Sequence, residues 1–154
     1  MCCCAMSDDA DLEVFYEQQR EDEAVRRAQF PARDRDHFLT HWRTNVFGNP
    51  TGRAQTVTVD GEVAGNIVAW WQDDRRFVGY WLGQRFWGRG VGTAALRQFL
   101  QRERVRPLCA DPFVGNTASV RLLERCGFRR VGTDRDGDLE FVVLRLDEGA
   151  ADEG

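Results

Sequence analysis

The sequence predicts a single domain of the α+β class. Two β-type runs are joined by Asp60-Gly61, segments with apolar residues at helical spacing lie on both sides of them, and 42% of the 154 residues are hydrophobic. A chain of this length buries roughly 68–70% of its unfolded surface, which is enough for a core without disulfide or metal support. The sequence shows no internal repeat and no sign of a second domain.

The N-terminal third is typical of helices. Residues 12–27 are rich in Glu, Gln, Arg and Ala after a short apolar start, which either belongs to the helix or forms a strand running into it. Asp34 or Asp36 is placed to cap a second helix, whose apolar face carries Leu39 and Trp42.

The middle of the chain predicts a hairpin and then a central strand. Residues 56–59 and 62–71 have β character, and the intervening Asp60-Gly61 supplies the positive φ angles of a type I′ turn. Residues 76–82 are apolar on both faces, as expected for a strand covered on both sides. A helix over residues 93–104 follows the glycine-rich segment after this strand.

The last third predicts a strand, a helix and two further strands. Residues 107–114 form the first strand, Asn116 caps the helix, and Gly127 is placed to end it in the left-handed conformation. Residues 128–131 and 139–146 form the final strands, joined by a polar connection.

We expect the folded domain to span residues 12–146. Residues 1–11 are predicted to be a disordered extension, and residues 1–5 are candidates for an artefact of start assignment because Met6 also offers a start. Residues 147–154 are small and acidic, which is typical of a flexible tail.

The segment from Tyr80 to Thr93 carries the clearest functional signal. A strand ends, three glycines alternate, and an amphipathic helix begins. Glycine lets the backbone approach a ligand, and the first N–H groups of a helix have no partner within it, so the segment favours a diphosphate. Arg89 adds a positive charge there. The dinucleotide pattern G-x-G-x-x-G is not met because its third glycine is replaced by Thr93, and a plain structural turn is the alternative interpretation.

A second segment, from Asn116 to Phe128, follows the glycine-loop helix after one strand. Together the two segments resemble the acetyl-CoA-dependent N-acetyltransferase (GNAT) superfamily, whose hallmarks are a Q/R-x-x-G-x-G/A loop and a later N-x-x-S/A…G-F segment. The resemblance covers residues 12–146 and looks closest to the branch resembling ribosomal-protein N-terminal acetyltransferases. It implies a three-layer fold in which a mixed, mostly antiparallel central sheet is flanked by helices.

The resemblance also implies a reaction and its site. Acetyl-CoA is the implied donor, and a primary amine of a small molecule or a protein N-terminus attacks it directly within a ternary complex. The strand end is assigned to the pantetheine arm and thioester carbonyl: Tyr80, Trp81 and Leu82. The loop and helix start are assigned to the diphosphate: Trp87, Gly88, Arg89, Gly90, Val91, Gly92 and Thr93. Asn116 and Ser119 are assigned to the far side of the pantetheine arm.

Two positions depart from the family pattern. Trp87 stands where many members carry Gln or Arg, so packing replaces a polar contact of the loop. Leu123 stands where many members place a Tyr general acid, so thiolate protonation by Tyr is not available from this position.

The catalytic groups are therefore sought elsewhere. Ser119 is the candidate acid, because its hydroxyl lies one turn into the helix and faces the expected thiolate. Glu140 is the candidate base that would deprotonate the amine. Glu17, Asp111 and a water relay without a single essential base stay open as alternatives.

Composition and charge exclude several other functions. All 21 basic residues are arginine, which rules out a P-loop lysine and a Schiff-base mechanism. The net charge of −4 argues against nucleic-acid binding. No apolar run approaches the ~18 residues of a membrane span, so no membrane partner and a cytoplasmic location are expected.

No metal site is expected either. Cys2, Cys3 and Cys4 are adjacent, which suits neither disulfide geometry nor a metal-ligand pattern. His37 and His41 have helical i, i+4 spacing, but the H-E-x-x-H motif requires Glu immediately after the first His, where this chain has Phe.

A second functional class stays open. The missing Tyr and the lack of a convincing base are also compatible with an acyl-CoA-binding module or sensor that has no turnover. The protein is expected to be a monomer or a homodimer, because an exposed end strand can pair with a second copy. The acidic N-terminal region either attracts a cationic amine or is an ordinary solvated face.

Overall fold

The computed structural model describes residues 2–29 and 32–148. Seven strands form one sheet in the order β1-β2-β3-β4-β5-β7-β6. The strands are β1 (Cys2–Met6), β2 (Arg53–Val59), β3 (Glu62–Gln72), β4 (Arg75–Leu82), β5 (Leu108–Ala110), β6 (Arg129–Asp136) and β7 (Leu139–Leu146). The helices are α1 (Leu12–Gln19), α2 (Asp22–Ala28), α3 (Arg35–His41), α4 (Val91–Arg102) and α5 (Thr117–Arg125). All strand pairs are antiparallel except β4 with β5, which confirms the predicted mixed, mostly antiparallel sheet.

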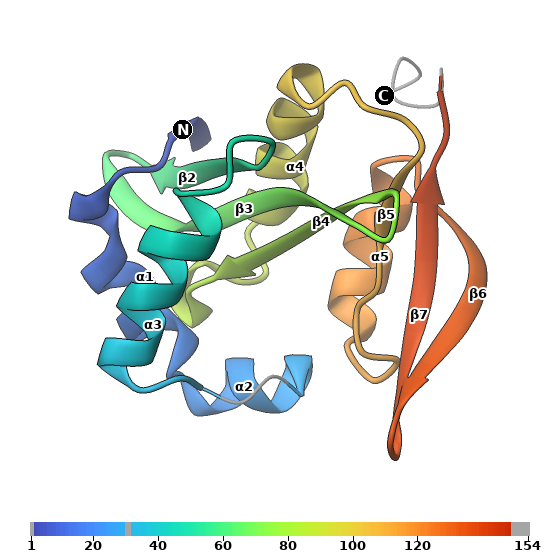
Figure 1. Cartoon of the computed structure of the whole chain (residues 1–154), viewed down its shortest axis with the longest axis horizontal. Coiled ribbons are helices and arrows are strands. Elements are labelled where there is room, and N and C mark those ends of the chain that lie inside the picture. Colours follow the sequence, from blue (N-terminus) through green and yellow to red (C-terminus); the bar gives the residue numbers. More distant parts are fainter. Residues whose placement is uncertain (1, 30–31, 149–154) are drawn as a thin grey trace.

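Helices cover both faces of this sheet and so complete the three layers (Figure 1). One core joins α4 and α5 to the sheet, with Phe99 and Leu123 packed among strand residues such as Ile67. The second core joins α1 and α3 to the other face, where Phe15 contacts Trp42 with ring centroids 5.0 Å apart. Successive residues of a strand point to opposite faces, so a central strand needs apolar residues throughout.

The N-terminal segment differs from the disordered extension that the sequence predicted. Cys2–Met6 pairs antiparallel with β2 and forms one edge of the sheet. The Cys4 N–H donates to Gln98 Oε1 at 3.1 Å, and Arg102 Nη1 donates to the Cys4 carbonyl at 2.6 Å. These partners are distant in sequence, so no local pattern could indicate them. The predicted tail lies outside the described residues from position 149 onward.

Several boundaries also differ from the predicted ones. The helix expected over residues 12–27 is two helices, α1 and α2. The strand expected over residues 107–114 is only three residues long, whereas β6 continues to Asp136 and forms a long ribbon with β7 (Figure 1). The predicted turn at Asp60-Gly61 has positive φ angles at both residues, as a type I′ hairpin requires.

The contact between β4 and β5 has two unlike ends. At the end that we call closed, the strands pair at only two positions, Arg76 with Leu108 and Phe77 with Cys109. Beyond them β5 stops, and residues 78–82 of β4, which we call the open end, have β3 as a neighbour on one side only. The sheet therefore divides at the point where the predicted functional segments meet.

An ion pair is buried at the closed end. Arg76 and Glu103 are 5% and 2% exposed, and Arg76 Nη2 donates to Glu103 Oε1 at 2.6 Å. Arg76 Nη1 also donates to the Thr51 carbonyl at 2.7 Å, and the Val105 N–H donates to Glu103 Oε2 at 3.2 Å. Buried charges are tolerated when they are paired and hydrogen-bonded in this way.

Candidate active site

The glycine loop has the geometry of an anion site. Gly88 and Gly90 have φ angles of 72° and 75°, and a Cβ atom added at either residue would meet nothing within 4 Å. The helix α4 begins directly after Gly90, so the N–H groups of its first turn have no carbonyl partner within the helix. The backbone thus presents polar hydrogens and the positive end of a helix dipole beside open space.

A cavity of about 470 Å³ lies in front of this loop. Of the twelve residues assigned to the donor from the sequence, eleven line it: Tyr80, Trp81, Leu82, Trp87, Gly88, Gly90, Val91, Gly92, Thr93, Asn116 and Ser119. The exception is Arg89, whose guanidinium carbon lies 5.7 Å from the centre of the Phe86 ring. The cation that the sequence placed in the loop is therefore absent from the cavity wall.

A second cavity, of about 1010 Å³, adjoins the first. Its wall combines aromatic rings from both sides of the sheet division with carboxylates that follow β5 and end β6: Phe15, Phe38, Trp42, Trp70, Trp71, Phe113, Phe141, Asp111, Asp134 and Asp136. The two cavities share Tyr80, Trp81, Asn116 and Ser119, together with Ala28 of α2. Molecules bound in the two cavities would therefore meet at the open end of β4.

Two hydroxyl groups meet at this junction. The Tyr80 hydroxyl lies 2.6 Å from Ser119 Oγ and donates to the Ser119 carbonyl at 3.2 Å. Burial raises the pKa of Tyr80 well above its usual range, with a smaller opposing effect of the Ser119 hydrogen bond, so the phenol stays neutral. Asn116 caps α5 by accepting from the Ser119 N–H at 3.4 Å, which holds Ser119 in the first turn of that helix.

The three carboxylates considered as bases occupy different surroundings. Glu140 lines neither cavity, and its Oε1 lies 3.7 Å from Arg135 Nη2 across the β6–β7 pair. Glu17 is exposed on α1, 3.5 Å from Arg20. Asp111 alone among the three lines the second cavity. Leu139 and Phe141 on either side of Glu140 line the same cavity, so Glu140, the candidate chosen from the sequence, lies on the opposite face of β7.

Asp111 has the ionisation behaviour of a usable base. Its surface is open to the cavity, yet desolvation by the surrounding protein raises its pKa, and the Asp134 carboxylate raises it further. A carboxylate with a raised pKa holds an abstracted proton better than an ordinary one. This property follows from neighbours on other strands and leaves no mark in the local sequence.

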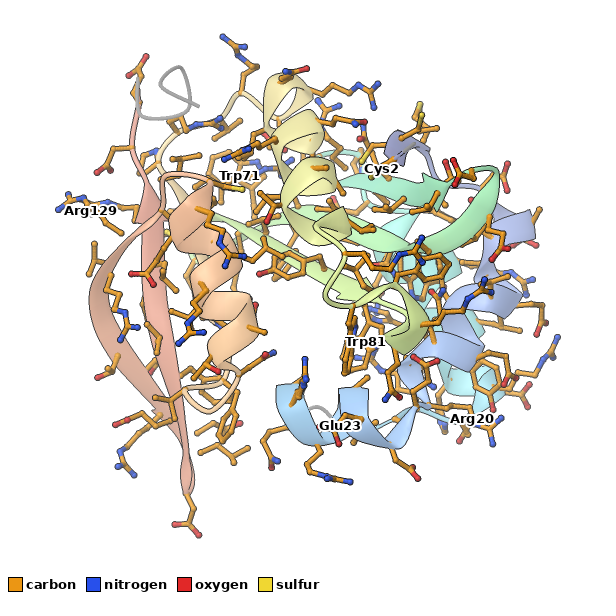
Figure 2. All side chains as sticks on the ribbon, turned by 180° about the vertical axis from the view of Figure 1, so that it is seen from behind. Cys2, Arg20, Glu23, Trp71, Trp81 and Arg129 are labelled. Carbon is orange, nitrogen blue, oxygen red and sulfur yellow. The ribbon has the colours of Figure 1, made fainter. Side chains whose placement is uncertain are left out.

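Trp81 and Trp87 anchor the open end of β4 and the loop. Trp81 Nε1 donates to the Gln18 carbonyl at 3.0 Å, which ties β4 to the end of α1. Figure 2 shows Trp81 beside α2, the helix that carries Glu23. Trp87 Nε1 donates to the Leu82 carbonyl at 3.0 Å, so packing and one hydrogen bond fix the ring that departs from the family pattern.

Leu123 and the two histidines, also singled out from the sequence, lie in different surroundings. Leu123 is buried in the core at 1% exposure. His37 Nδ1 lies 2.6 Å from Asp34 Oδ2 at the start of α3, whereas His41 lines the second cavity, and burial lowers its pKa. Within residues 2–29 and 32–148, no group of three or more His, Cys, Asp or Glu side chains is placed to hold a metal ion. No helix in this part of the chain is long and apolar enough to cross a membrane.

Comparisons with known sequences identify the family. The acetyltransferase (GNAT) domain model matches residues 5–129. Among curated proteins, the "Putative ribosomal N-acetyltransferase YdaF" of Bacillus subtilis (strain 168) is 32% identical over 113 residues, which cover 67% of this chain. The match spans 60% of that relative's length.

Solved structures with the same fold include complexes with coenzyme A. The aminoglycoside acetyltransferase AAC(6')-Ib with coenzyme A superposes with a TM-score of 0.84 at 19% identity, covering 99% of this chain and 98% of that one. The ribosomal L7/L12 alpha-N-protein acetyltransferase RimL with coenzyme A gives a TM-score of 0.80 at 16% identity, covering 97% and 95%. At these identities the similarity concerns the fold.

Proposed function

Because the chain belongs to the acetyltransferase (GNAT) family, we propose that it transfers an acetyl group from acetyl-CoA to a primary amine. The acceptor amine belongs to a small molecule or to a protein N-terminus. The observation that carries this proposal is the junction at Tyr80 and Ser119, where a cavity beside an anion-binding loop opens into a second, larger cavity. Donor and acceptor then meet without any nucleophile supplied by the protein.

The donor fits the first cavity by its chemistry. The α4 N-terminus and the glycine loop would hold the diphosphate, and the open end of β4 would offer its backbone to the amide-containing pantetheine arm. When bound, acetyl-CoA supplies a thioester carbonyl that an amine can attack. Ser119 and Tyr80, which line both cavities, would then be the residues beside the thioester.

The reaction requires a neutral amine and a stabilised leaving thiolate. A C–N bond forms at the carbonyl carbon while the C–S bond breaks, and the amine gives up one proton as the sulfur gains one. Asp111 accepts the amine proton, directly or through a water molecule. In the second cavity the neighbouring Asp134 favours the approach of an ammonium form before that proton is lost.

Ser119 acts on the leaving group. When the Tyr80 hydroxyl donates to Ser119 Oγ, the serine O–H is free to donate to the thiolate. When Tyr80 donates to the Ser119 carbonyl instead, the serine proton turns back toward Tyr80. A hydroxyl is a much weaker acid than a thiol, so this donation stabilises the thiolate, and the final proton comes from the amine through solvent or Asp111.

A thiol-release assay over a panel of amines tests the proposal. We expect acetyl-CoA to raise the melting temperature and to yield free thiol with at least one amine. Tight CoA binding without thiol release across the panel would favour the alternative, an acyl-CoA-binding module without turnover. No stabilisation at millimolar acetyl-CoA would contradict both functions.

A further inference from the structure

The glycine loop lacks a cation of its own in the cavity. Trp87 occupies the position where many family members carry Gln or Arg, and Arg89 packs on the Phe86 ring outside the cavity wall. Backbone N–H groups carry partial charges only, whereas a diphosphate brings full negative charges into a partly desolvated site. Outside the loop, three arginines line the cavity, Arg27 of α2 and Arg121 and Arg125 of α5, and of these Arg27 lies over the ring of Trp87 in the loop itself.

Arg27 of α2 lies in the required position. Its guanidinium carbon is 4.1 Å from the centre of the Trp87 ring, and the side chain lines the same cavity as the loop glycines. Its other partner is Glu23, 3.6 Å away on the same helix and partly exposed, which is a weak surface pair. The guanidinium plane is thus held by an aromatic face, and its N–H groups stay available to an anion.

The helix that carries Arg27 is attached to the loop region. Ala24, one turn earlier, is 4% exposed, so this face of α2 is packed against the protein. Glu21, at the start of α2, accepts from the Gln84 N–H at 2.8 Å. These contacts fix α2 beside the loop although the two segments are about sixty residues apart in sequence.

We propose that Arg27, seated on Trp87, binds the diphosphate of the donor and replaces the polar side chain that the loop has lost. This inference rests on the proposed function, because it names a donor-binding residue of the same site. Arginine suits the task through its planar fork of donors, which matches phosphate oxygens in pairs. The role of the aromatic residue at position 87 is then to hold the guanidinium group of Arg27 by a cation–π contact.

Calorimetric titration with CoA tests the proposal, with and without added salt. Arg27→Gln should weaken CoA binding roughly tenfold at low ionic strength, and the difference should shrink at high salt, where charges are screened. The matched control is Arg26→Gln, since Arg26 is a neighbouring exposed arginine paired with Glu23 at 3.0 Å and does not line the cavity. It should bind CoA like the unmodified protein.

Two further measurements separate the diphosphate from other contacts. The Arg27→Gln loss should persist for dephospho-CoA, which keeps the diphosphate but lacks the ribose 3′-phosphate, and should vanish for pantetheine, which lacks both. In a Trp87→Gln background, Arg27→Gln should weaken CoA binding by a smaller factor. The new amide can contact the diphosphate, and Arg27 has already lost the aromatic ring that holds it, so the effects of the two substitutions should not be additive. An equal loss for CoA and pantetheine, or no loss for either, would overturn the assignment of Arg27.

The outcome for the unmodified protein keeps the two proposals distinguishable. If the unmodified protein binds no CoA, the proposed function fails together with this inference. If it binds CoA and Arg27→Gln binds equally well, only the role of Arg27 fails.

Discussion

The two ends of the β4–β5 contact carry buried polar groups of opposite character. At the closed end, Arg76 and Glu103 form an ion pair that is almost completely buried and is bonded to the backbone as well. At the open end, Tyr80 and Ser119 are neutral, partly buried and adjoin a cavity on either side. The same strand therefore carries a buried ion pair at one end and a hydroxyl pair accessible from two cavities at the other.

The difference separates stability from chemistry along one strand. A buried charge whose partner is removed stays uncompensated, so the closed end tolerates no loss. Neutral hydroxyl groups beside a cavity can be satisfied by solvent, so the open end can redirect its hydrogen bonds at little cost. Substitutions at the two ends should consequently change different measured quantities.

The largest expected effect is on stability at the closed end. Glu103→Ala should lower the free energy of unfolding by about 3–5 kcal/mol, because it leaves the Arg76 guanidinium buried without its partner. Urea denaturation measures this loss. As a control, Glu124→Ala removes an exposed pair with Arg130 at 3.7 Å and should cost less than about 1 kcal/mol. Similar losses for both variants would refute the special contribution of the buried ion pair at the closed end.

At the open end the expected effect is on turnover. Ser119→Ala and Tyr80→Phe should each lower kcat about 10–100-fold by weakening a hydrogen bond to the developing thiolate, with little change in the KM for acetyl-CoA. The free energy of unfolding should fall by only about 1 kcal/mol in each case. Steady-state kinetics and urea denaturation together check the prediction, and an unchanged kcat in both variants would dismiss the hydroxyl pair from the reaction.

The pH profile sharpens the assignment of the base. Asp111 must be ionised to accept a proton, and desolvation together with the Asp134 charge raises its pKa. As the pH is lowered, turnover should therefore begin to fall at a higher pH than it would for an ordinary carboxyl group. Asp111→Asn should lower kcat about tenfold or more and remove this acid limb. Asp134→Asn removes a neighbouring negative charge, lowers the pKa of Asp111 and should shift the limb to lower pH.

Glu140→Gln is the informative comparison for that profile. The sequence favoured Glu140 as base, whereas the structure places it on the β6–β7 ribbon beside Arg135. We expect this variant to keep both the rate and the acid limb. Loss of the limb in Glu140→Gln, with Asp111→Asn unaffected, would return the role to Glu140.

The smallest expected effect concerns the loop backbone. Gly90→Ala places a side chain at a φ of 75°, which should cost about 1 kcal/mol although the added Cβ meets no neighbour. Gly61→Ala at the hairpin turn is the matched control, with a φ of 84° and equally open space. Both should lose similar stability, but only Gly90→Ala should weaken CoA binding in a calorimetric titration.

Local sequence signals predicted the parts of the molecule that depend on local backbone geometry. The type I′ turn at Asp60-Gly61, the cap at Asn116 and the loop glycines were all expected, because each conformation is set by a few adjacent residues. The family resemblance rests on the same short segments. It therefore predicted the fold, and eleven of the twelve residues that it assigned to the donor line one cavity.

What the sequence missed depends on contacts between distant segments. The strand at Cys2–Met6 is stabilised by β2 and α4, and Arg27 reaches the loop from another helix. The raised pKa of Asp111 depends first on desolvation by the surrounding segments and then on Asp134. Glu140 was chosen because a carboxylate on a late strand lay near polar turns, but strand register decides which way such a residue points. None of these contacts produces a periodic pattern or a short motif in the sequence.

The unpaired stretch of β4 has a consequence for the bound state. Peptide groups along a strand face its two neighbours alternately, so part of the backbone over residues 78–82 is turned away from β3 toward the division of the sheet. An extended ligand with amide groups would serve there as a surrogate strand and bridge the two halves of the sheet. Amide hydrogen exchange along this stretch would then slow on donor binding, as though the missing sheet neighbour had been restored.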